Sequence, residues 1–261
     1  SFLVADASTA IVVETAGRRW ATEIVRGRAR SISNELTIAG FAAAHSDPVR
    51  SGVAAARRRR RLTTAAAQAA TSELDLFAAL RSHGGGPDPD YSPWNGAMAA
   101  PCVHAGGLLA SSQTTGSWVS RLSDRPRHWA TATSAPCTSL FKPVSVDLPV
   151  ELGPAPTDRA DTESTWWRHE TLHRVAARDL GACVARFAHE RDAVERAWVE
   201  APPPSDQAFA VAAELEARCT ADVRCADPPD RRPLVARAHW RRQQRAARWS
   251  PLSEPAEAPR S

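Results

Sequence analysis

Lysine is almost missing from this 261-residue chain: Lys142 is the only one, so arginine supplies nearly all of the 33 basic side chains. A GC-rich coding sequence accounts for that bias without a functional demand. The one dense basic run, residues 57–61, has no interleaved aromatic residue on which nucleic-acid bases would stack. Because the net charge is only +4, we interpret this run as the solvated start of a helix and expect no nucleic-acid partner.

Long apolar runs are missing too. None could span a bilayer, and the first residues show no signal-peptide pattern. These absences predict a soluble, cytoplasmic protein without a membrane partner. The composition of 43% hydrophobic and 24% charged residues still allows a packed core. The chain opens at Ser1, without Met and directly in a strand-like run, so we expect that the natural protein begins upstream.

Cysteine is present, but its spacing does not indicate a disulfide framework. The five cysteines are scattered, odd in number and never spaced as C-x-x-C, which argues against a set of disulfides and against a zinc ribbon. Cys102 and Cys137 have no sequence neighbour with a clear reason to lower the pKa of a thiol. We therefore interpret both as small residues of the core.

Apolar and turn residues in the first 150 positions predict an alternation of strands and helices. Short strand-like runs separated by turns fill residues 1–40 and return between 107 and 146. Between them, helical spacing predicts two helices within 53–82, the second starting at a capping box of Ser72 and Asp75.

The rest of the chain reads as helical and then irregular. Apolar residues recur at helical spacing over 165–200, which predicts one continuous helix that a run of prolines ends. Another helix is expected over 206–219. Residues 227–261 are rich in Pro and Arg with little apolar periodicity, and we expect them to be disordered. Strands, helices, strands and helices in this order predict an α+β layered architecture.

A possible metal motif lies at the start of the long predicted helix. His169, Glu170 and His173 form the pattern H-E-x-x-H within W-W-R-H-E-T-L-H-R-V. On a helix this pattern places two imidazoles one turn apart beside a carboxylate, as many zinc proteases hold their metal and general base. The pattern is short and arises readily by chance.

A zinc protease also needs a third protein ligand. Ala176 stands where the metzincin pattern has a helix-breaking glycine. If the helix continues, Asp179 turns off the face that the two histidines share, and Glu190 and Glu195 lie far along the axis. Flanking arginines raise the electrostatic cost of a cation. We interpret the motif as a charged helix face and keep a zinc hydrolase as the least favoured alternative.

The motif's surroundings carry a family resemblance. Five runs occur in order: I-S-N-E-L-T-I at 32–38, C-V-H-A-G-G at 102–107, S-Q-T-T-G-S-W-V-S at 112–120, T-S-A-P-C-T-S-L-F-K-P-V at 133–144 and W-W-R-H-E-T-L-H-R at 166–174. Together they resemble the secernin and cysteine-dipeptidase family of N-terminal nucleophile (Ntn) hydrolases. The resemblance covers residues 1 to 200; each run is weak alone, and five in order make a specific match. In that family the H-E-x-x-H run looks like part of a structural helix.

The resemblance implies a fold and a reaction. The fold would be a four-layer αββα sandwich, here incomplete at its N-terminus. A cysteine at the start of the mature chain attacks an amide carbonyl, with its own α-amino group as base, and water hydrolyses the acyl-enzyme. An Asn side chain and backbone N–H groups stabilise the oxyanion. The resemblance implies a dipeptide or small amide substrate, no cofactor and no metal, and it allows a homo-oligomer.

The chain departs from the family at the nucleophile. The family's Cys and the N-S-D-R-type segment after it would lie upstream, and Ser1 aligns with the start of an internal strand instead. The resemblance leaves Asn34 as the catalytic oxyanion donor, in a strand-end S-N-E-L run. It leaves His104 and Gln113 as substrate-binding candidates. Without its first, central strand, such a sandwich exposes unpaired edges, so we expect the isolated chain to fold poorly or aggregate.

These predictions define the expected domain organisation of the chain. Residues 1–226 form one Ntn-hydrolase-like domain, mainly sheet with two helices over 1–150 and helical over 165–226, followed by the 227–261 tail. The functional alternatives are a cysteine-type dipeptidase or small amide hydrolase, a non-catalytic secernin-like binding or structural protein, and the zinc hydrolase.

Overall fold

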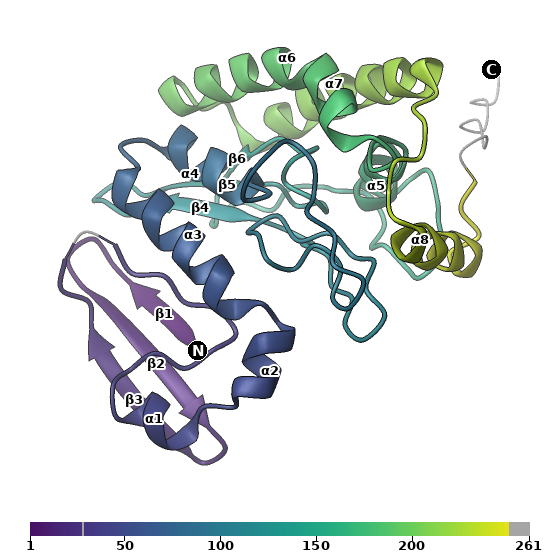
Figure 1. Cartoon of the computed structure of the whole chain (residues 1–261). Coiled ribbons are helices and arrows are strands. Elements are labelled where there is room, and N and C mark those ends of the chain that lie inside the picture. Colours follow the sequence, from purple (N-terminus) through teal and green to yellow (C-terminus); the bar gives the residue numbers. More distant parts are fainter. Residues whose placement is uncertain (28, 251–261) are drawn as a thin grey trace.

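The computed structural model describes residues 1–27 and 29–250 and shows a mixed α+β protein (Figure 1). The predicted α+β class is therefore confirmed. Its strands are β1 Phe2–Ala5, β2 Ala10–Ala16, β3 Arg19–Ile24, β4 Trp118–Arg121, β5 Arg127–Ala130 and β6 Lys142–Val144. Its helices are α1 Phe41–His45, α2 Pro48–Val53, α3 Ala56–Ala69, α4 Glu73–Arg81, α5 Thr165–Ala176, α6 Leu180–Glu200, α7 Ser205–Ala226 and α8 Leu234–Ala246.

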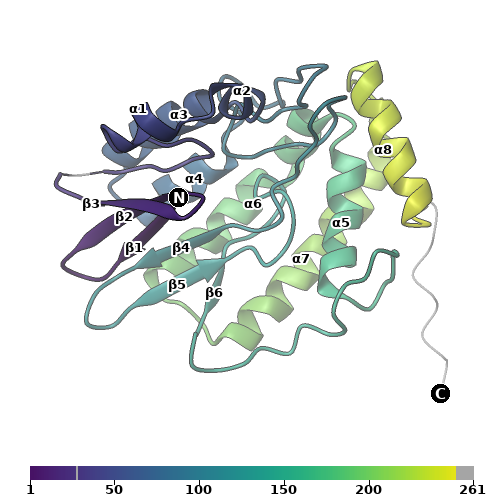
Figure 2. The ribbon, with the colours of Figure 1, turned by 90° about the horizontal axis from the view of Figure 1, so that it is seen from below.

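The first sheet is antiparallel, with β2 between β1 and β3. One of its faces is buried: Val12 and Glu14 are fully enclosed, and α1, α2 and α3 lie along one side of the sheet (Figure 2). The Glu14 carboxylate accepts hydrogen bonds from the backbone N–H groups of Thr37 and Ile38. A buried carboxylate with these donors ties the loop after β3 to the sheet.

The opposite side of this sheet is an open apolar face. Phe2, Val4, Trp20 and Ile24 lie on it, and the strand register puts them on the same side as residues 11, 13 and 15 of β2. The four side chains are between 57% and 68% exposed, which is unusual for large apolar residues gathered on one sheet. β1 is also an edge strand whose outer side pairs with no described strand. We call these four side chains the open apolar face.

The second sheet, β4–β5–β6, is covered on one side by helices. Val119 and Trp129 pair across β4 and β5 and so point to the same side. There they pack with Phe77 of α4 and with Phe141, whose ring stacks on Phe77 at 4.2 Å between centroids. α4 begins at the Ser72–Asp75 capping box, as predicted, because that signal is entirely local. The other side of the sheet leaves Trp118 half exposed.

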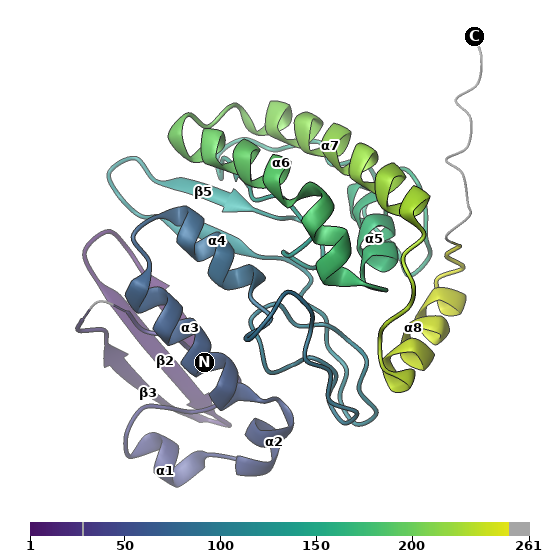
Figure 3. The same ribbon diagram turned by 45° about the horizontal axis from the view of Figure 1, so that its top comes forward.

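Helices α5, α6 and α7 make the largest core. α6 and α7 lie side by side over the second sheet (Figure 3), and α5 packs against α7. Leu172, Phe187 and Leu215, one from each helix, belong to one buried cluster. Within the described residues, no helix is both long and apolar enough to cross a membrane.

The prediction of one continuous helix over 165–200 is wrong. α5 ends at Ala176 and α6 begins at Leu180. Contacts with distant segments hold the break: the backbone N–H of Gly181 donates to Asp88 at 2.7 Å, and Asp179 pairs with Arg231 at 2.7 Å. Apolar spacing continues across the break, so the pattern of α5 and α6 alone could not reveal it.

The expectation of disorder is also wrong for part of the C-terminal segment. Residues 234–246 form α8, and Trp240 on it is only 4% exposed. Its indole N–H donates to the carbonyl of Ala105 at 3.0 Å, and the Arg174 guanidinium lies over its ring. A loop and α5 bury Trp240, and the composition of the C-terminal segment alone does not reveal these distant contacts. Residues 251–261 lie outside the described part of the chain.

Candidate functional site

Three loops bring two histidines and two cysteines together behind α4. His83 directly follows the C-cap residue of that helix, Ser82. Cys102 and His104 come from an irregular loop, held to α4 by a hydrogen bond from the Cys102 backbone N–H to the Ser82 carbonyl. Cys137 lies in a tight turn between β5 and β6. All four side chains of this Cys–His cluster are buried, with 0–6% exposure.

The potential ligand atoms of the Cys–His cluster converge. His104 Nε2 lies 3.1 Å from His83 Nε2, 3.4 Å from Cys102 Sγ and 3.6 Å from Cys137 Sγ. All four atoms lie within 4.8 Å of one another, and no other group of three or more His, Cys, Asp or Glu side chains in the described residues gathers in this way.

Backbone contacts fix the ring of His83. Its Nδ1 lies 2.7 Å from the carbonyl oxygen of Pro87. A carbonyl can only accept, so Nδ1 carries the proton and, in a neutral ring, Nε2 presents a lone pair to the cluster. The turn that carries Cys137 is held as well, because Arg191 donates to the Cys137 carbonyl at 2.6 Å.

The surroundings shift the pKa values of the two cluster thiols in opposite directions. Burial opposes ionisation of Cys137, but hydrogen bonding from Cys102, the charge of His104 and hydrogen bonds from His104 and His83 hold its pKa well below the ordinary value. Burial, together with the neighbouring Cys137, raises the pKa of the Cys102 thiol. Burial also lowers the pKa of His104. These surroundings make Cys137 the more acidic of the two thiols, and a thiol that ionises readily is a good donor for a soft cation.

A cavity of about 580 Å³ opens beside the Cys–His cluster. His83 and Cys137 reach its wall, and the other two cluster residues lie behind them. Its lining also includes Arg81, Gly85, Gly181 and Arg191. The cluster is thus buried but adjoins a space through which a small ion or molecule can arrive.

Of the three site residues predicted from the sequence, two lie at or beside the Cys–His cluster and one does not. His104 lies at the centre of the cluster, and Gln113 is beside it: its side-chain oxygen accepts from the backbone N–H of Ala105, and its nitrogen lies 3.5 Å from His173 Nε2. Asn34 is exposed and contacts Arg59 on α3 instead.

Three members of the cluster were missed by the sequence analysis. His83, Cys102 and Cys137 are separated by 19 and 35 residues along the chain, so no short spacing marks them as a group. The one local signal was C-V-H, which places Cys102 two residues from His104. The interpretation of Cys102 and Cys137 as core residues agrees with their burial, but the expectation that nothing lowers a thiol pKa is wrong for Cys137, because its imidazole neighbours arrive through the fold.

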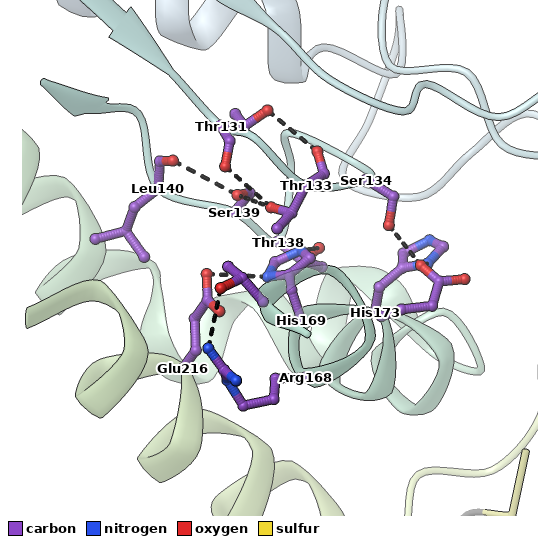
Figure 4. Close-up of polar contacts among 12 residues, drawn as sticks. Thr131, Thr133, Ser134, Thr138, Ser139, Leu140, Arg168, His169, His173 and Glu216 are labelled. Carbon is purple, nitrogen blue, oxygen red and sulfur yellow. Dashed lines mark hydrogen bonds and ion pairs between the residues drawn. The ribbon is translucent and has the colours of Figure 1, made fainter. Parts of the chain in front are cut away.

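The H-E-x-x-H side chains turn to different partners (Figure 4). His169 Nδ1 lies 3.0 Å from a Glu216 oxygen of α7, and its Nε2 lies 3.2 Å from the Thr138 hydroxyl. His173 Nδ1 instead pairs with Glu170 at 3.1 Å. Because these groups stabilise the contacts of α5 with its neighbours and do not converge, we do not propose a zinc hydrolase at this motif.

The earlier third-ligand candidates are occupied as well. Asp179 pairs with Arg231, and Glu190 and Glu195 pair with Arg218 and Arg81. The helix break after Ala176 was not foreseen, but it does not bring Asp179 to the two histidines.

Acid should weaken α5 through Glu170. Burial would raise the pKa of this carboxyl, but the charge and hydrogen bond of His173, together with Arg174 and Ser134, lower it from 4.5 to about 2. A carboxyl whose pKa is lower in the folded state stabilises the folded protein at pH values above its unfolded-state pKa. This stabilisation is lost as the pH falls from 4.5 towards 2. It amounts to about 3 kcal/mol.

Urea unfolding at pH 6 and pH 3 measures the part of this loss that falls between the two pH values, about 2 kcal/mol. Glu170→Gln should lose less stability than the unmodified chain between the two pH values. The exposed Glu200→Gln serves as the control and should follow the unmodified chain. Equal pH dependence of all three proteins would contradict the role given to Glu170.

No family model and no solved structure matches the chain. What the chain does is therefore inferred from its own residues and from the resemblance of its sequence runs.

Proposed function

We propose that this chain is part of a cysteine-type dipeptidase or small amide hydrolase of the Ntn class. In this proposal its sheets belong to an αββα sandwich, and a segment outside the present sequence supplies the nucleophilic cysteine. The observation that carries the proposal is the free edge of β1, which starts beside the residue after Asn34, in a sheet whose open apolar face is uncovered. The ordered resemblance of the five sequence runs supports it independently.

The start of β1 lies beside the segment that carries Asn34. The Ser1 hydroxyl is 3.4 Å from the carbonyl oxygen of Glu35, the residue after Asn34. A strand that adds to the free edge of β1 would therefore pass close to the Asn34 side chain, since edge strands present unpaired N–H and C=O groups to an incoming strand. A segment that continues from this strand across the sheet would also cover the open apolar face, so one segment would account for both features.

One contact holds the Asn34 amide in a fixed orientation, which supports its proposed role as an oxyanion donor. Its oxygen accepts a hydrogen bond from Arg59 Nη2 at 2.8 Å, and Arg59 is itself fixed by the carbonyls of Ala54 and Met98. With the oxygen held, the amide N–H₂ group faces away from Arg59, and no described residue accepts from it. A preorganised N–H donor is what a developing oxyanion requires. Arg59 acts in this scheme as a positioning residue.

The test uses the full gene product, including the coding sequence upstream of Ser1. We expect hydrolysis within a panel of dipeptides, abolished when the upstream cysteine is changed to serine. Asn34→Ala should lower kcat by about 10²–10³-fold with little change in KM, because it removes one oxyanion donor. Arg59→Ala should also lower kcat, whereas Arg58→Ala, a neighbouring exposed arginine that pairs with Asp90, should leave it unchanged.

Two results would overturn this proposal. A full gene product that contains the upstream cysteine but hydrolyses no dipeptide or small amide would favour a non-catalytic secernin-like protein. Full activity in Asn34→Ala would remove Asn34 from the site.

A further inference from the structure

We propose that His83, Cys102, His104 and Cys137 bind one zinc ion in a closed, four-coordinate site that joins three loops. This inference goes beyond the proposed hydrolase function and does not depend on it. Neither the H-E-x-x-H motif nor Asn34 takes part.

The donor set is the one that zinc prefers. Two thiolates and two imidazoles make a tetrahedral set typical of structural zinc, and the same soft donors disfavour magnesium or calcium. The charges also balance, because two thiolates neutralise a divalent cation inside a buried site.

The three separations from His104 Nε2 fit a tetrahedron. With Zn–N near 2.0–2.1 Å and Zn–S near 2.3 Å, tetrahedral geometry separates two nitrogens by about 3.3 Å and a nitrogen from a sulfur by about 3.6 Å. The observed separations from His104 Nε2 are 3.1 Å to the nitrogen of His83 and 3.4 and 3.6 Å to the two sulfurs. Four side chains from three loops therefore surround a space of the size that one ion needs.

Hydrogen bonding without an ion is a poor alternative. His104 Nε2 has three close polar neighbours, yet a neutral imidazole nitrogen carries either one proton or one lone pair and cannot satisfy them all. A cation replaces these competing contacts with four coordinate bonds. His83 is ready for this role, since its Nδ1–H donates to Pro87 and leaves Nε2 for the metal, the usual outer contact of a zinc-bound histidine.

The site would act as a structural clamp. Four protein ligands fill the coordination sphere, so no position remains for a catalytic water. The ligands come from the end of α4, the loop with Cys102 and the turn with Cys137, which regular secondary structure does not join. The ion can enter through the neighbouring cavity, which His83 and Cys137 line. Binding of Zn²⁺ to two thiols and two neutral imidazoles releases two protons, so affinity should rise with pH.

The test is metal loading of the chain, purified under reducing conditions and treated with chelator. We expect one equivalent of zinc to be retained after dialysis, and Co²⁺ to give the visible bands of a tetrahedral thiolate site. Cys137→Ser and His104→Ala should weaken Co²⁺ binding by more than about 100-fold. Cys183→Ser, which removes another buried cysteine, and Cys225→Ser, which removes an exposed one, should bind as the unmodified chain does.

Alkylation of the unmodified chain keeps the proposal testable if a ligand variant fails to fold. Mass spectrometry after iodoacetamide should find Cys102 and Cys137 protected with zinc and modified after chelation, with Cys225 modified in both states. Retention of less than about a tenth of an equivalent of zinc, with no Co²⁺ bands, would overturn the proposal. So would equal alkylation of Cys137 with and without zinc. Neither result bears on dipeptide hydrolysis, so the two proposals fail separately.

Discussion

Glu195→Ala should lower the free energy of unfolding by about 3–5 kcal/mol, because it leaves a largely buried guanidinium, that of Arg81, without its carboxylate partner. Glu195 is 1% exposed and binds Arg81 through both oxygens, at 2.7 and 2.5 Å. It also accepts from the backbone N–H of Phe141 at 2.6 Å. The Phe141 N–H would lose its acceptor inside the core, and the Arg81 guanidinium would lose the only negative charge that it binds among the described residues.

The same contact supports the candidate functional site. Arg81 also donates from Nε to the carbonyl of Pro136 and from Nη2 to the carbonyl of Ser139, on either side of the turn that carries Cys137. Loss of Glu195 should therefore loosen this turn as well as the packing of α6. In the presence of zinc, the proposed ion would hold the turn independently, and part of the lost stability should return.

Urea unfolding measures the effect, with Glu190→Ala as the matched control. Glu190 lies on the same helix and pairs with Arg218, but both side chains are more than half exposed. Such a surface pair contributes about 0–1 kcal/mol. Similar losses in the two variants would show that the buried pair has no special role. The double change Arg81→Met with Glu195→Leu should recover much of the stability, since it leaves no unpaired charge.

The second large effect concerns the open apolar face. We expect the chain alone to self-associate, because Phe2, Val4, Trp20 and Ile24 are uncovered beside a free strand edge. Changing both Trp20 and Ile24 to Thr keeps β-branched strand formers on β3 and removes most of the apolar contact. Sedimentation velocity should show a shift from mainly oligomer to mainly monomer at the same concentration.

A matched substitution separates this face from general surface effects. Trp94→Thr removes a tryptophan of similar exposure, 60% against 68% for Trp20, from a loop far from the first sheet in sequence. It should leave the oligomeric distribution unchanged. A chain that is already monomeric, with sharp, cooperative melting, would contradict the expected self-association and would weaken the proposal that another segment covers the face.

Local signals predicted much of the secondary structure. The first three strands, the capping box at Ser72 and the helices that became α3, α4 and α7 follow from residues within a few positions of one another. Alternation along β2 puts Val12 and Glu14 on one face whatever lies beyond the strand. The mixed α+β class could be predicted for the same reason.

Long-range contacts decided the rest. The break before α6 depends on Asp88 and Arg231, and the order of α8 depends on where Trp240 packs. The resemblance pointed to His104, and its runs include Cys102 and Cys137, but nothing in the sequence showed that these side chains and His83 meet.

The sequence by itself thus determined the local elements and the supply of donor groups, since both depend on residue type and near spacing. Only the tertiary structure decided which donors meet. His83 and Cys137 are 54 positions apart in the chain. Their ligand atoms lie 3.1 and 3.6 Å from His104 Nε2, because the end of α4 and the turn before β6 pack against the same loop. Tertiary packing also buries one face of the first sheet and leaves the other open. The alternation of residues along the strands assigns each residue to a face but does not show which face is covered.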